Sequence, residues 1–444
     1  MEVTRALARF VVRSRPGDIP APARREAVRS LVNWFACALG GSHHEAIGIA
    51  LEAMAPFAGA PQASVLGRRE RLDCLNAALI NGMSAHVLDF DDTQLRTLLH
   101  PGVAIAPPLL ALGERAPLAG RDFLHAFVLG VDVASRIANA IYTAHNVNWY
   151  ITGTAGVFGA AAAAGKVLGL DEQRMAWAFG IAATQAAGLR EMAGTMCKSF
   201  VHGRAAQNGM SAAFLASHGF TGSERAIEAP RGFANVLAPE HRLEEITDGL
   251  GERWEILLNT YKPHACGVVV HPVIDGCIEL RAAGSLQPGQ VASVALRVHP
   301  LALKLAGIRE PRGGLESKWS IYHSAAVALC DGAAGERQYT DERVRDPAVT
   351  RLREKVSADA DASLREDAAR VKIALADGRS LERHVEHAAG SADNPLSDGA
   401  LDAKFRALAE GVLPGKQAEA LLARCRAVAD LGNVAELARL GSLG

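Results

Sequence analysis

The amino-acid sequence predicts a mainly α-helical protein with an α+β part, and three observations lead to this fold class. A chain of 444 residues is too long for one ordinary hydrophobic core, so more than one domain is expected. Aromatic residues make up only 5% of the chain while alanine and glycine are abundant, which favours closely packed helices. Near residue 259 the helical spacing of apolar residues changes to the alternation that is typical of strands.

These observations divide the chain into three segments. We expect a large all-helical domain formed by residues 1–258 and by a helical tail, residues 396–444, that rejoins it. Residues 259–395 would form a smaller α+β lid domain inserted between them. The helices that are predicted in the first segment, from apolar residues at helical spacing, span 22–41, 71–90, 158–170 and 203–222.

The lid is expected to alternate strands and helices. VASVALRV at 291–298 has the alternation and the β-branched residues of a strand. VKIALADGRSLERHV at 371–385 predicts two strands joined by an Asp-Gly turn, which is a strong hairpin signal. Helical stretches are expected at 320–332, near 346–356 and, towards the tail, at 391–409.

Composition and charge argue against several classes of partner. A net charge of −1 gives no reason to expect nucleic acid or an anionic membrane. The first 18 residues carry Glu2, Arg5 and Arg9 among apolar residues, which predicts an amphipathic helix rather than a signal peptide. No uncharged stretch approaches membrane-spanning length. Seven scattered cysteines without a CxxC pair are typical of reduced thiols, so a cytoplasmic protein is expected.

The stretch AHVLDFDDTQLRTLLHPG at 85–102 concentrates three aspartates, two histidines and an arginine. Adjacent aspartates in an all-α protein can bind Mg²⁺ for a diphosphate substrate, because hard cations prefer carboxylate oxygens. No second acidic cluster follows in the helical segment, and Arg96 would repel the metal. A Mg²⁺-dependent isoprenoid enzyme is therefore only a remote alternative.

The three aspartates of this stretch are expected to have different roles. Asp91 and Asp92 would hold the loop by bonding backbone amides, as aspartate does at helix caps and turns. Asp89 would lie beside His100, because a carboxylate next to an imidazole sets its tautomer.

A second cluster, TMCKSFVHGRAAQNG at 195–209, combines cations with small residues. Lys198 and His202 are four residues apart and share a helix face, and Arg204 follows closely. The cluster leads into an Ala/Gly-rich helix that is expected to be buried, so these cations would lie at a domain edge or cleft. Fixed cations in a cleft suit a carboxylated ligand.

Two other stretches contain residue types that occur in metal or phosphate sites. His264, Cys266 and His271 have a spacing that matches no common zinc site, and a fourth ligand is not evident. The glycine turn in PRGGLESKWSIYHSAAVAL at 311–329 lacks the GxxxxGK[ST] spacing of a phosphate loop. The sequence therefore predicts no metal site.

Six motifs stand in a fixed order over nearly the whole chain: LDFDDT with HPG, TGTAGVFGAAAAAGKVLGL, MCKSFVHGRAAQNGMSAAFLASHGFTG, YKPHACGVVVHPVIDG, ESKWSIYH and NPLSDGALDAKF. This series resembles the motifs of the MmgE/PrpD family, which includes 2-methylcitrate dehydratase, cis-aconitate decarboxylase and iminodisuccinate epimerase. The resemblance implies a helical domain with an α/β lid, a homodimer, and an active site between the two domains. It also implies cofactor-free chemistry on small di- or tricarboxylates.

The resemblance assigns active-site roles to particular positions. The family's aspartate and threonine in DFDDT correspond to Asp89 and Thr93, and its histidine in the following HP pair corresponds to His100, after a slightly longer spacer. The family's lysine before the HxGxAA stretch corresponds to Lys198.

Two positions differ from the decarboxylase pattern. Tyr150 stands where that pattern has a histidine, and His323 stands where it has a tyrosine. Decarboxylation of cis-aconitate is therefore not the first expectation. Because the two residue types are exchanged, we expect Tyr150 and His323 to face one another across the cleft as a second proton-handling pair.

The chemistry shared by the family is removal of a proton from the carbon beside a carboxylate. Cations and hydrogen-bond donors lower that barrier when they are preorganised in a dry site, and Lys198 is the residue expected to do this or to transfer the proton itself. His100, oriented by Asp89, is expected to be the general base or acid. The residues expected to bind the substrate are Thr93, His202, Arg204, Lys262 and Lys318.

The predicted function is a cofactor-free lyase of the 2-methylcitrate dehydratase type that eliminates water from a small di- or tricarboxylate. An epimerase of an iminodisuccinate-like dicarboxylate is the main alternative, because the same acid–base groups return a proton to the opposite face. No cofactor, metal, nucleic acid or membrane is expected as a partner. The protein is expected to form a homodimer.

Overall fold

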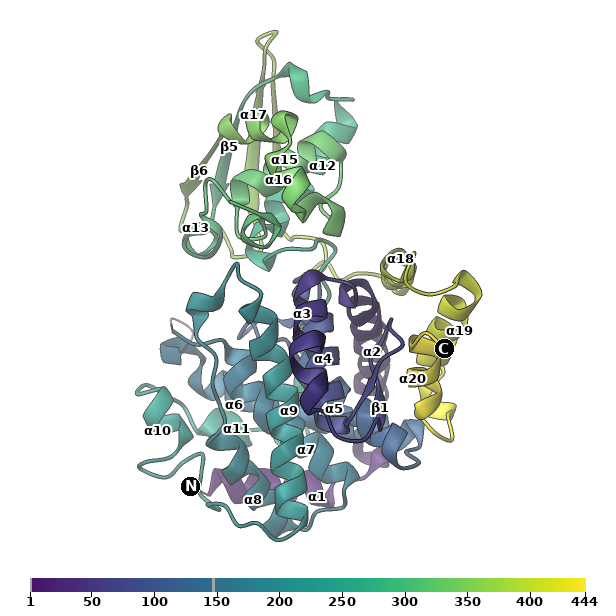
Figure 1. The fold of residues 1–444 in the computed structure, drawn as a ribbon. Helices are drawn as coiled ribbons and strands as arrows, with labels where there is room; N and C mark the ends of the chain where they lie inside the picture. The colour runs from purple at the N-terminus through teal and green to yellow at the C-terminus, as the bar shows by residue number, and fades with distance from the viewer. Residues whose placement is uncertain (1, 146–147) are drawn as a thin grey trace.

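The computed structural model describes residues 2–145 and 148–444 of the chain. It confirms the predicted fold class, because a large body of helices carries a smaller α+β body at one end (Figure 1). The lid, coloured green, stands above the helices of the first segment, and the yellow tail lies along the side of those helices (Figure 1).

The helical domain is built around central helices with small residues at their contacts. Its helices are α1 (Val3–Arg13), α2 (Ala21–Gly41), α3 (Glu45–Met54), α4 (Cys74–Val87), α5 (Pro101–Arg115), α6 (Gly120–His145), α7 (Ile151–Val167), α8 (Glu172–Ala183), α9 (Cys197–Ser217), α10 (Phe233–Leu237) and α11 (Glu244–Thr247). Gly130 of α6 and Gly159 of α7 meet so closely that a Cβ on Gly130 would lie 2.8 Å from the Gly159 carbonyl oxygen. The small residues therefore allow the close helix contacts that the composition favours.

The crossing of α4 and α9 positions two of the motifs. A Cβ on Gly82 of α4 would lie 2.9 Å from the Cα of Gly203 of α9, and a Cβ on Gly203 would overlap the Leu79 carbonyl oxygen. Only glycine permits backbones to approach this closely. As a result, the end of α4 and the first turns of α9 lie side by side.

The stretch Gly120–Tyr142 of α6 is long and apolar enough to cross a membrane by length and composition, but its most apolar 18-residue window is completely buried inside the helical domain. A helix that is hydrophobic on all sides is expected at the centre of a large domain. Within it, Arg136 Nε donates to Asp132 at 2.6 Å, and Arg136 also donates to the Asp248 carbonyl at 2.7 Å. This buried group ties the chain after α11 to the domain core.

The lid is a four-stranded sheet with helices packed against it. Its strands are β5 (Val291–Val298), β6 (Val356–Ala360), β7 (Ala369–Leu375) and β8 (Ser380–Val385), in the order β6-β5-β7-β8. β5 is parallel to β6 and antiparallel to β7, and β7 and β8 form the predicted hairpin. Its helices are α12 (His271–Ala283), α13 (Pro300–Ala306), α14 (Gly314–Ser317), α15 (Ile321–Asp331), α16 (Asp341–Arg345) and α17 (Pro347–Glu354).

Two short strand pairs lie outside the lid sheet: β1 (Ala63–Ser64) with β2 (Arg71–Leu72), and β3 (Thr93–Gln94) with β4 (Asn259–Thr260). The second pair joins the acidic stretch after α4 to the segment that leads into the lid. Thr260 Oγ1 donates to the Thr93 carbonyl at 2.6 Å, which adds a side-chain bond to the pairing. The acidic stretch is therefore held at the boundary between the two domains.

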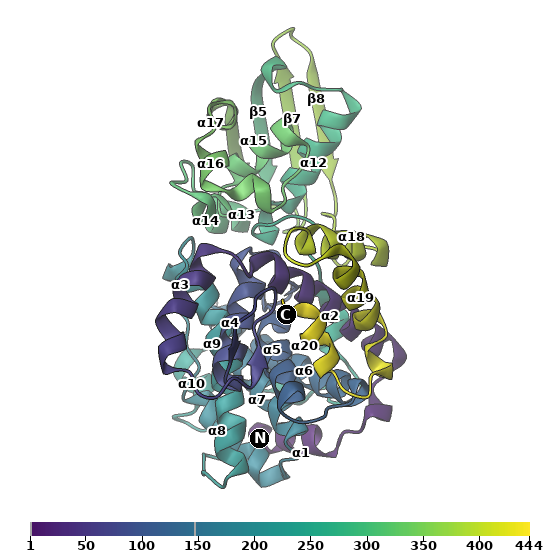
Figure 2. The same ribbon diagram turned by 45° about the vertical axis from the view of Figure 1, so that its right-hand side comes forward.

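The tail returns to the helical domain. Its helices are α18 (Asp398–Ala409), α19 (Gly415–Arg426) and α20 (Ala435–Gly441). α18 and α19 pack on α2, and α20 packs on α5 (Figure 2). The helix expected at 391–409 begins only at Asp398, because the Ser397 hydroxyl accepts from the Ala400 N–H and caps the first turn.

Candidate active site

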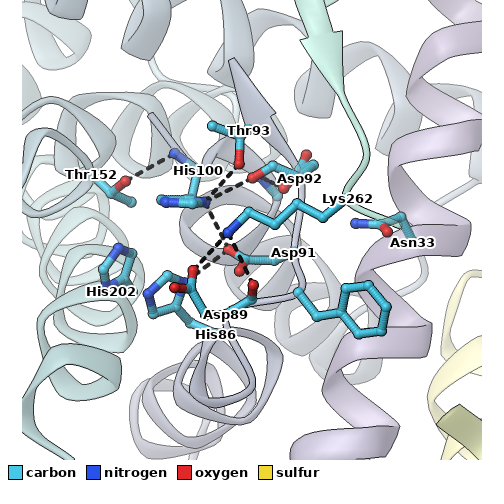
Figure 3. Close-up of polar contacts among 12 residues, drawn as sticks. Asn33, His86, Asp89, Asp91, Asp92, Thr93, His100, Thr152, His202 and Lys262 are labelled. Carbon is cyan, nitrogen blue, oxygen red and sulfur yellow. Dashed lines mark hydrogen bonds and ion pairs between the residues drawn. The ribbon is translucent and has the colours of Figure 1, made fainter. Parts of the chain in front are cut away.

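The acidic stretch follows α4 directly and begins with an unusual backbone conformation. Asp89 has a φ of 52°, in the left-handed region that residues with side chains rarely adopt. Its buried carboxylate lies between two ammonium groups: Lys262 Nζ donates to Oδ1 at 2.6 Å (Figure 3), and Lys198 Nζ lies 3.1 Å from Oδ2. Lys262 Nζ also donates to the Asp89 carbonyl at 3.0 Å, so one ammonium group binds both the side chain and the strained backbone.

Burial and charge set the protonation of these three groups. Burial alone would raise the pKa of Asp89, but the ammonium groups of Lys198 and Lys262 outweigh it and hold the pKa well below its usual value. Burial lowers the pKa of Lys198, while the Asp89 carboxylate raises the pKa of Lys262 against the effect of burial. Asp89 is therefore ionised and Lys262 is the more firmly protonated of the two lysines.

His100 is oriented by Asp91 and not, as the sequence predicted, by Asp89. His100 Nδ1 lies 2.9 Å from the Asp92 carbonyl oxygen, 3.2 Å from Asp91 Oδ2 and 3.3 Å from Thr93 Oγ1 (Figure 3). Since the carbonyl and the carboxylate can only accept, Nδ1 carries the proton and Nε2 is left as the basic nitrogen. The prediction failed because the left-handed turn at Asp89 directs its carboxylate to the lysines.

Asp91 also binds a second imidazole. Asp91 Oδ2 accepts from His86 Nδ1 at 2.9 Å, and the His86 ring stacks on the His202 ring with centroids 3.4 Å apart (Figure 3). Burial lowers the pKa of His86 to about 3 and that of His202 well below its usual value, so both rings are neutral near pH 7. His202 Nδ1 donates to the Lys198 carbonyl at 2.8 Å. His202, predicted to bind substrate, instead packs behind His86.

The imidazoles of His86, His100 and His202 lie close enough together to be tested as a metal site. A metal ion binds an imidazole along the nitrogen lone pair, in the plane of the ring. The planes of the stacked His86 and His202 rings are only 15° from parallel, so their lone pairs do not converge on one ion. The donor set therefore does not fit a metal that both rings would hold.

Asp92 has the backbone-bonding role that the sequence predicted, whereas Asp91 has a different one. Asp92 Oδ1 accepts from the Gly102 N–H at 3.1 Å, in the first turn of α5. Its Oδ2 accepts from Ser30 Oγ and from Asn259 Nδ2, both at 2.7 Å. Asp92 thus joins α2, α5 and β4 beneath the site.

A small pocket between the helical domain and the lid collects these groups. Six residues proposed from the sequence are in its wall: Asp89, Thr93, His100, Tyr150, Lys198 and Lys262. Sequence reasoning missed two further wall residues, Arg190 and Trp319. The Lys198 ammonium lies 4.6 Å from the centroid of the Trp319 ring, and the Arg190 guanidinium lies 5.7 Å from that of the Tyr150 ring.

Tyr150 brings a protonated hydroxyl to the pocket wall. Its hydroxyl is buried and has no hydrogen-bond partner among the described residues. Burial raises the pKa of this phenol well above its usual value, so it stays protonated. The pocket thus contains one basic imidazole nitrogen and one unpaired phenol.

A larger cleft of about 480 Å³ adjoins the pocket. The two share the side chains of Leu98, Lys262, Val268 and Val269, so the cleft leads directly to the Asp89–Lys262 ion pair. Arg96, the cation that follows the three aspartates, lies in the wall of this cleft.

Two predicted substrate anchors are engaged elsewhere. Lys318 Nζ donates to the Leu88 and Ala265 carbonyls, both at 2.7 Å, and so joins the acidic stretch to the start of the lid. Arg204 bonds the side-chain oxygen of Gln207, one turn along its own helix. Lys318 nevertheless lies in the wall of a second small pocket beside Asp89, Lys198 and Trp319. Charge and helical spacing give no information about which carbonyl or amide a cation meets in the fold.

His323 does not reach the pocket wall in the described structure, and the pair predicted between His323 and Tyr150 is not formed. His323 Nε2 donates to the Gln338 carbonyl at 2.8 Å, and its ring lies beside that of Tyr339 inside the lid. Trp319, four residues earlier in the same motif and just before α15, is the residue that enters the pocket. The motif was recognised correctly, but α15 turns its later residues into the lid core.

The chain matches two family models in succession: the MmgE/PrpD N-terminal domain over residues 5–246 and the MmgE/PrpD C-terminal domain over residues 264–427. It is 28% identical over 469 aligned residues to the cis-aconitate decarboxylase-like protein oryM of Aspergillus oryzae. This alignment covers 99% of this chain and 97% of that protein. It is 28% identical to the cis-aconitate decarboxylase of Mus musculus (85% of this chain, 80% of that protein) and 26% identical to that of Homo sapiens (99% and 94%). Because the two domain models together span nearly the whole chain, the protein belongs to the MmgE/PrpD family.

Proposed function

We propose that this protein is a cofactor-free lyase that removes the proton beside a carboxylate of a small di- or tricarboxylate and eliminates water, as a 2-methylcitrate dehydratase does. The observation that carries the proposal is the pairing, in one pocket, of an oriented imidazole with two ammonium groups and an unpaired phenol. Family membership and the cis-aconitate decarboxylases among the relatives support a lyase with a carboxylate substrate.

The lysine ammonium groups of the pocket bind the substrate carboxylates in this proposal. Lys198 and Lys262 flank Asp89, which neutralises one of their two charges. The remaining positive charge suits a carboxylate of the substrate. Fixed cations also stabilise the enediolate that forms when the neighbouring carbon loses a proton, and such preorganised charges act most strongly in a dry site.

His100 is the general base of this mechanism. Its Nε2 takes the proton from the carbon beside the carboxylate, and the C–H electron pair moves into that carboxylate as an enediolate. Asp91 and the Asp92 carbonyl hold the Nδ1 proton, which keeps the ring in one orientation and stabilises the imidazolium that forms.

Tyr150 is the general acid. As the enediolate collapses, its electrons form the carbon–carbon double bond, the C–O bond breaks and the leaving hydroxyl takes the Tyr150 proton. The products are an alkene and water, and solvent then takes the His100 proton and restores that of Tyr150. Burial keeps the phenol protonated until this step.

Decarboxylation is the second candidate, and the relatives that carry this activity in their names favour it. In that reaction a C–CO₂ bond breaks, its electrons move into the substrate's double bond and an acid protonates the carbon that receives them. The same pocket groups serve this chemistry. Tyr150 in place of the histidine of the decarboxylase pattern is the reason for placing dehydration first.

The test is turnover in D₂O with NMR detection, in the presence of EDTA, on 2-methylcitrate, citrate, cis-aconitate and iminodisuccinate. We expect alkene signals to appear from a hydroxy acid as the substrate disappears. Loss of CO₂ from cis-aconitate would instead assign the decarboxylase, and deuterium uptake without loss of substrate would assign the epimerase. His100→Gln should abolish turnover. His125→Gln should retain it, because the His125 imidazole lies near the start of α6, bonds Ser14 and is not in the pocket wall.

A further inference from the structure

The backbone of the acidic stretch is held by three lysines that come from three separate parts of the chain. Lys318 belongs to the lid, Lys262 to the segment that leads into the lid, and Lys404 to α18 of the tail. Each ammonium group donates to one of three consecutive carbonyls: Lys318 to Leu88 at 2.7 Å, Lys262 to Asp89 at 3.0 Å and Lys404 to Phe90 at 2.6 Å. We call these three residues the lysine clamp.

The clamp binds carbonyls that lie just beyond the helix. α4 ends at Val87 with Leu88 as its C-cap, so the carbonyls of Leu88, Asp89 and Phe90 are outside the hydrogen-bond ladder of the helix. These residues are buried, and a buried carbonyl needs a donor from elsewhere in the fold. Cations near a helix C-terminus are favourable because they also interact with the negative end of the helix dipole. The left-handed φ of Asp89 breaks the helical path at this point, and the donors to the three carbonyls come from three separate parts of the chain.

Lys404 makes the most contacts of the three. Besides the Phe90 carbonyl, its ammonium group donates to the Lys262 carbonyl at 2.9 Å and to Asn33 Oδ1 at 2.8 Å. It also lies 3.8 Å from the centroid of the Phe90 ring. Its three donor positions are therefore all used, and burial lowers the pKa of the amine to about 8.

We propose that Lys404, in the tail and outside the pocket wall, is a positioning residue that sets the Asp89–Lys262 ion pair for reaction. One ammonium group binds the carbonyl next to Asp89 and the carbonyl of Lys262 itself, so it fixes the backbone on both sides of that ion pair. This inference rests on the proposed function in so far as that function places Asp89 and Lys262 in the active site.

Lys166 provides a matched control for a purely structural role. It is also a partly buried lysine whose ammonium group donates to two carbonyls, those of Val12 and Ser14, both at 2.8 Å. Burial lowers its pKa as well. It joins α7 to the end of α1 and makes no contact with the acidic stretch, so Lys166→Met removes the same kind of bond without touching the site.

The experiment compares Lys404→Met with Lys166→Met in the full-length protein. Tm, kcat/KM and the hydrogen exchange of a peptide covering residues 85–95 are measured for both. We expect Lys404→Met to lower kcat/KM at least tenfold more than Lys166→Met at a similar loss of Tm. We also expect its 85–95 peptide to exchange faster than in the wild type, while Lys166→Met leaves that peptide unchanged.

Two outcomes would overturn the proposal: unchanged exchange of residues 85–95 in Lys404→Met, or a kcat/KM equal to that of Lys166→Met. If Lys404→Met does not fold, Lys404→Gln, which keeps one N–H donor group and removes the charge, takes its place under the same criteria. A wild type that turns over none of the tested carboxylates would count against the proposed function alone, because the exchange comparison does not depend on the reaction.

Discussion

At the residue scale, the two first aspartates of the acidic stretch have separate tasks. Asp89 places two ammonium groups at the pocket wall, and Asp91 fixes the tautomer of His100 and binds His86. The resemblance to the family correctly picked Asp89 and His100 as neighbours in one pocket. It gave no means of seeing that a left-handed turn separates the two and assigns the imidazole to Asp91, because the turn is stabilised by lysines distant in sequence.

Replacement of Lys198 tests the charge stabilisation at this scale. Lys198→Met removes an ammonium group that faces the pocket, and loss of one preorganised group of this kind typically lowers kcat by about 10²–10³-fold. Arg204→Met is the control, because this cation lies on the same helix but bonds Gln207. We expect steady-state kinetics to show the loss for Lys198→Met and wild-type rates for Arg204→Met. Equal losses in the two variants would contradict the geometry.

At the element scale, the elements that were predicted best are those with a strong local signal. The strand expected at 291–298 is β5 residue for residue, and the Asp-Gly turn does join β7 to β8. β6 was missed, because the alternation in VSADA spans only five residues and two of its three apolar positions are alanine, which is depleted in strands; in the fold this segment pairs with β5. Local patterns therefore predict local elements, whereas partners such as these depend on the tertiary fold.

Local sequence patterns also predicted only part of the pocket. The sequence supplied six of the pocket residues, but Trp319 and Arg190 carry no spacing or composition signal of their own. His323 and Arg204 had such signals and lie elsewhere, because the turn of a helix decides which of its residues enters the pocket.

The crossing of α4 and α9 gives a prediction at the element scale. A Cβ on Gly203 would overlap the backbone oxygen of Leu79, which cannot move away as a side-chain end can. Overpacking of this kind costs about 1–3 kcal/mol of stability. Because α9 carries Lys198 and His202, we expect Gly203→Ala to lower both the free energy of unfolding and kcat.

The control for this variant is Gly48→Ala. Gly48 lies within α3, and a Cβ there would meet no atom within 4 Å, so the substitution should leave stability unchanged or raise it by up to about 1 kcal/mol. Denaturant unfolding and steady-state kinetics measure both variants. If the Gly203→Ala protein is as stable and as active as Gly48→Ala, α4 and α9 move apart without a loss of stability, which would contradict the prediction.

At the scale of the whole molecule, the site is assembled from every part of the chain. The helical domain supplies Asp89 and Lys198, the segment leading into the lid supplies Lys262, and the lid supplies Trp319. The tail contributes Lys404, which lies outside the pocket wall and donates to the Phe90 carbonyl. In the proposed mechanism, activity therefore depends on the docking of lid and tail as well as on the pocket groups.

The lid adds a pH dependence to this assembly through His323. Burial lowers the pKa of His323 to about 4, whereas the unfolded chain has the ordinary value of about 6.5. Between these values the unfolded state binds more protons than the folded state, so stability falls as the pH drops through this window. At about 1.4 kcal/mol for each unit of pKa, this one group removes up to about 3 kcal/mol by pH 4.

His323→Gln isolates this effect. The glutamine amide can donate to the Gln338 carbonyl as His323 Nε2 does, but it does not take up a proton in this range. We expect calorimetry from pH 7.5 to pH 4.5 to show a smaller fall in Tm for His323→Gln than for the wild type. The Tm of the control variant His218→Gln, which replaces an exposed histidine, should fall with pH as that of the wild type does.

The kcat of His323→Gln is a separate readout. Since His323 lies inside the lid and not in the pocket wall, kcat at pH 7.5 should stay within about twofold of the wild type, a change of about 0.4 kcal/mol in the activation barrier. A large loss of kcat at neutral pH would show that His323 takes part in the reaction. An unchanged slope of Tm against pH would show that the burial of His323 does not set the acid stability of the lid.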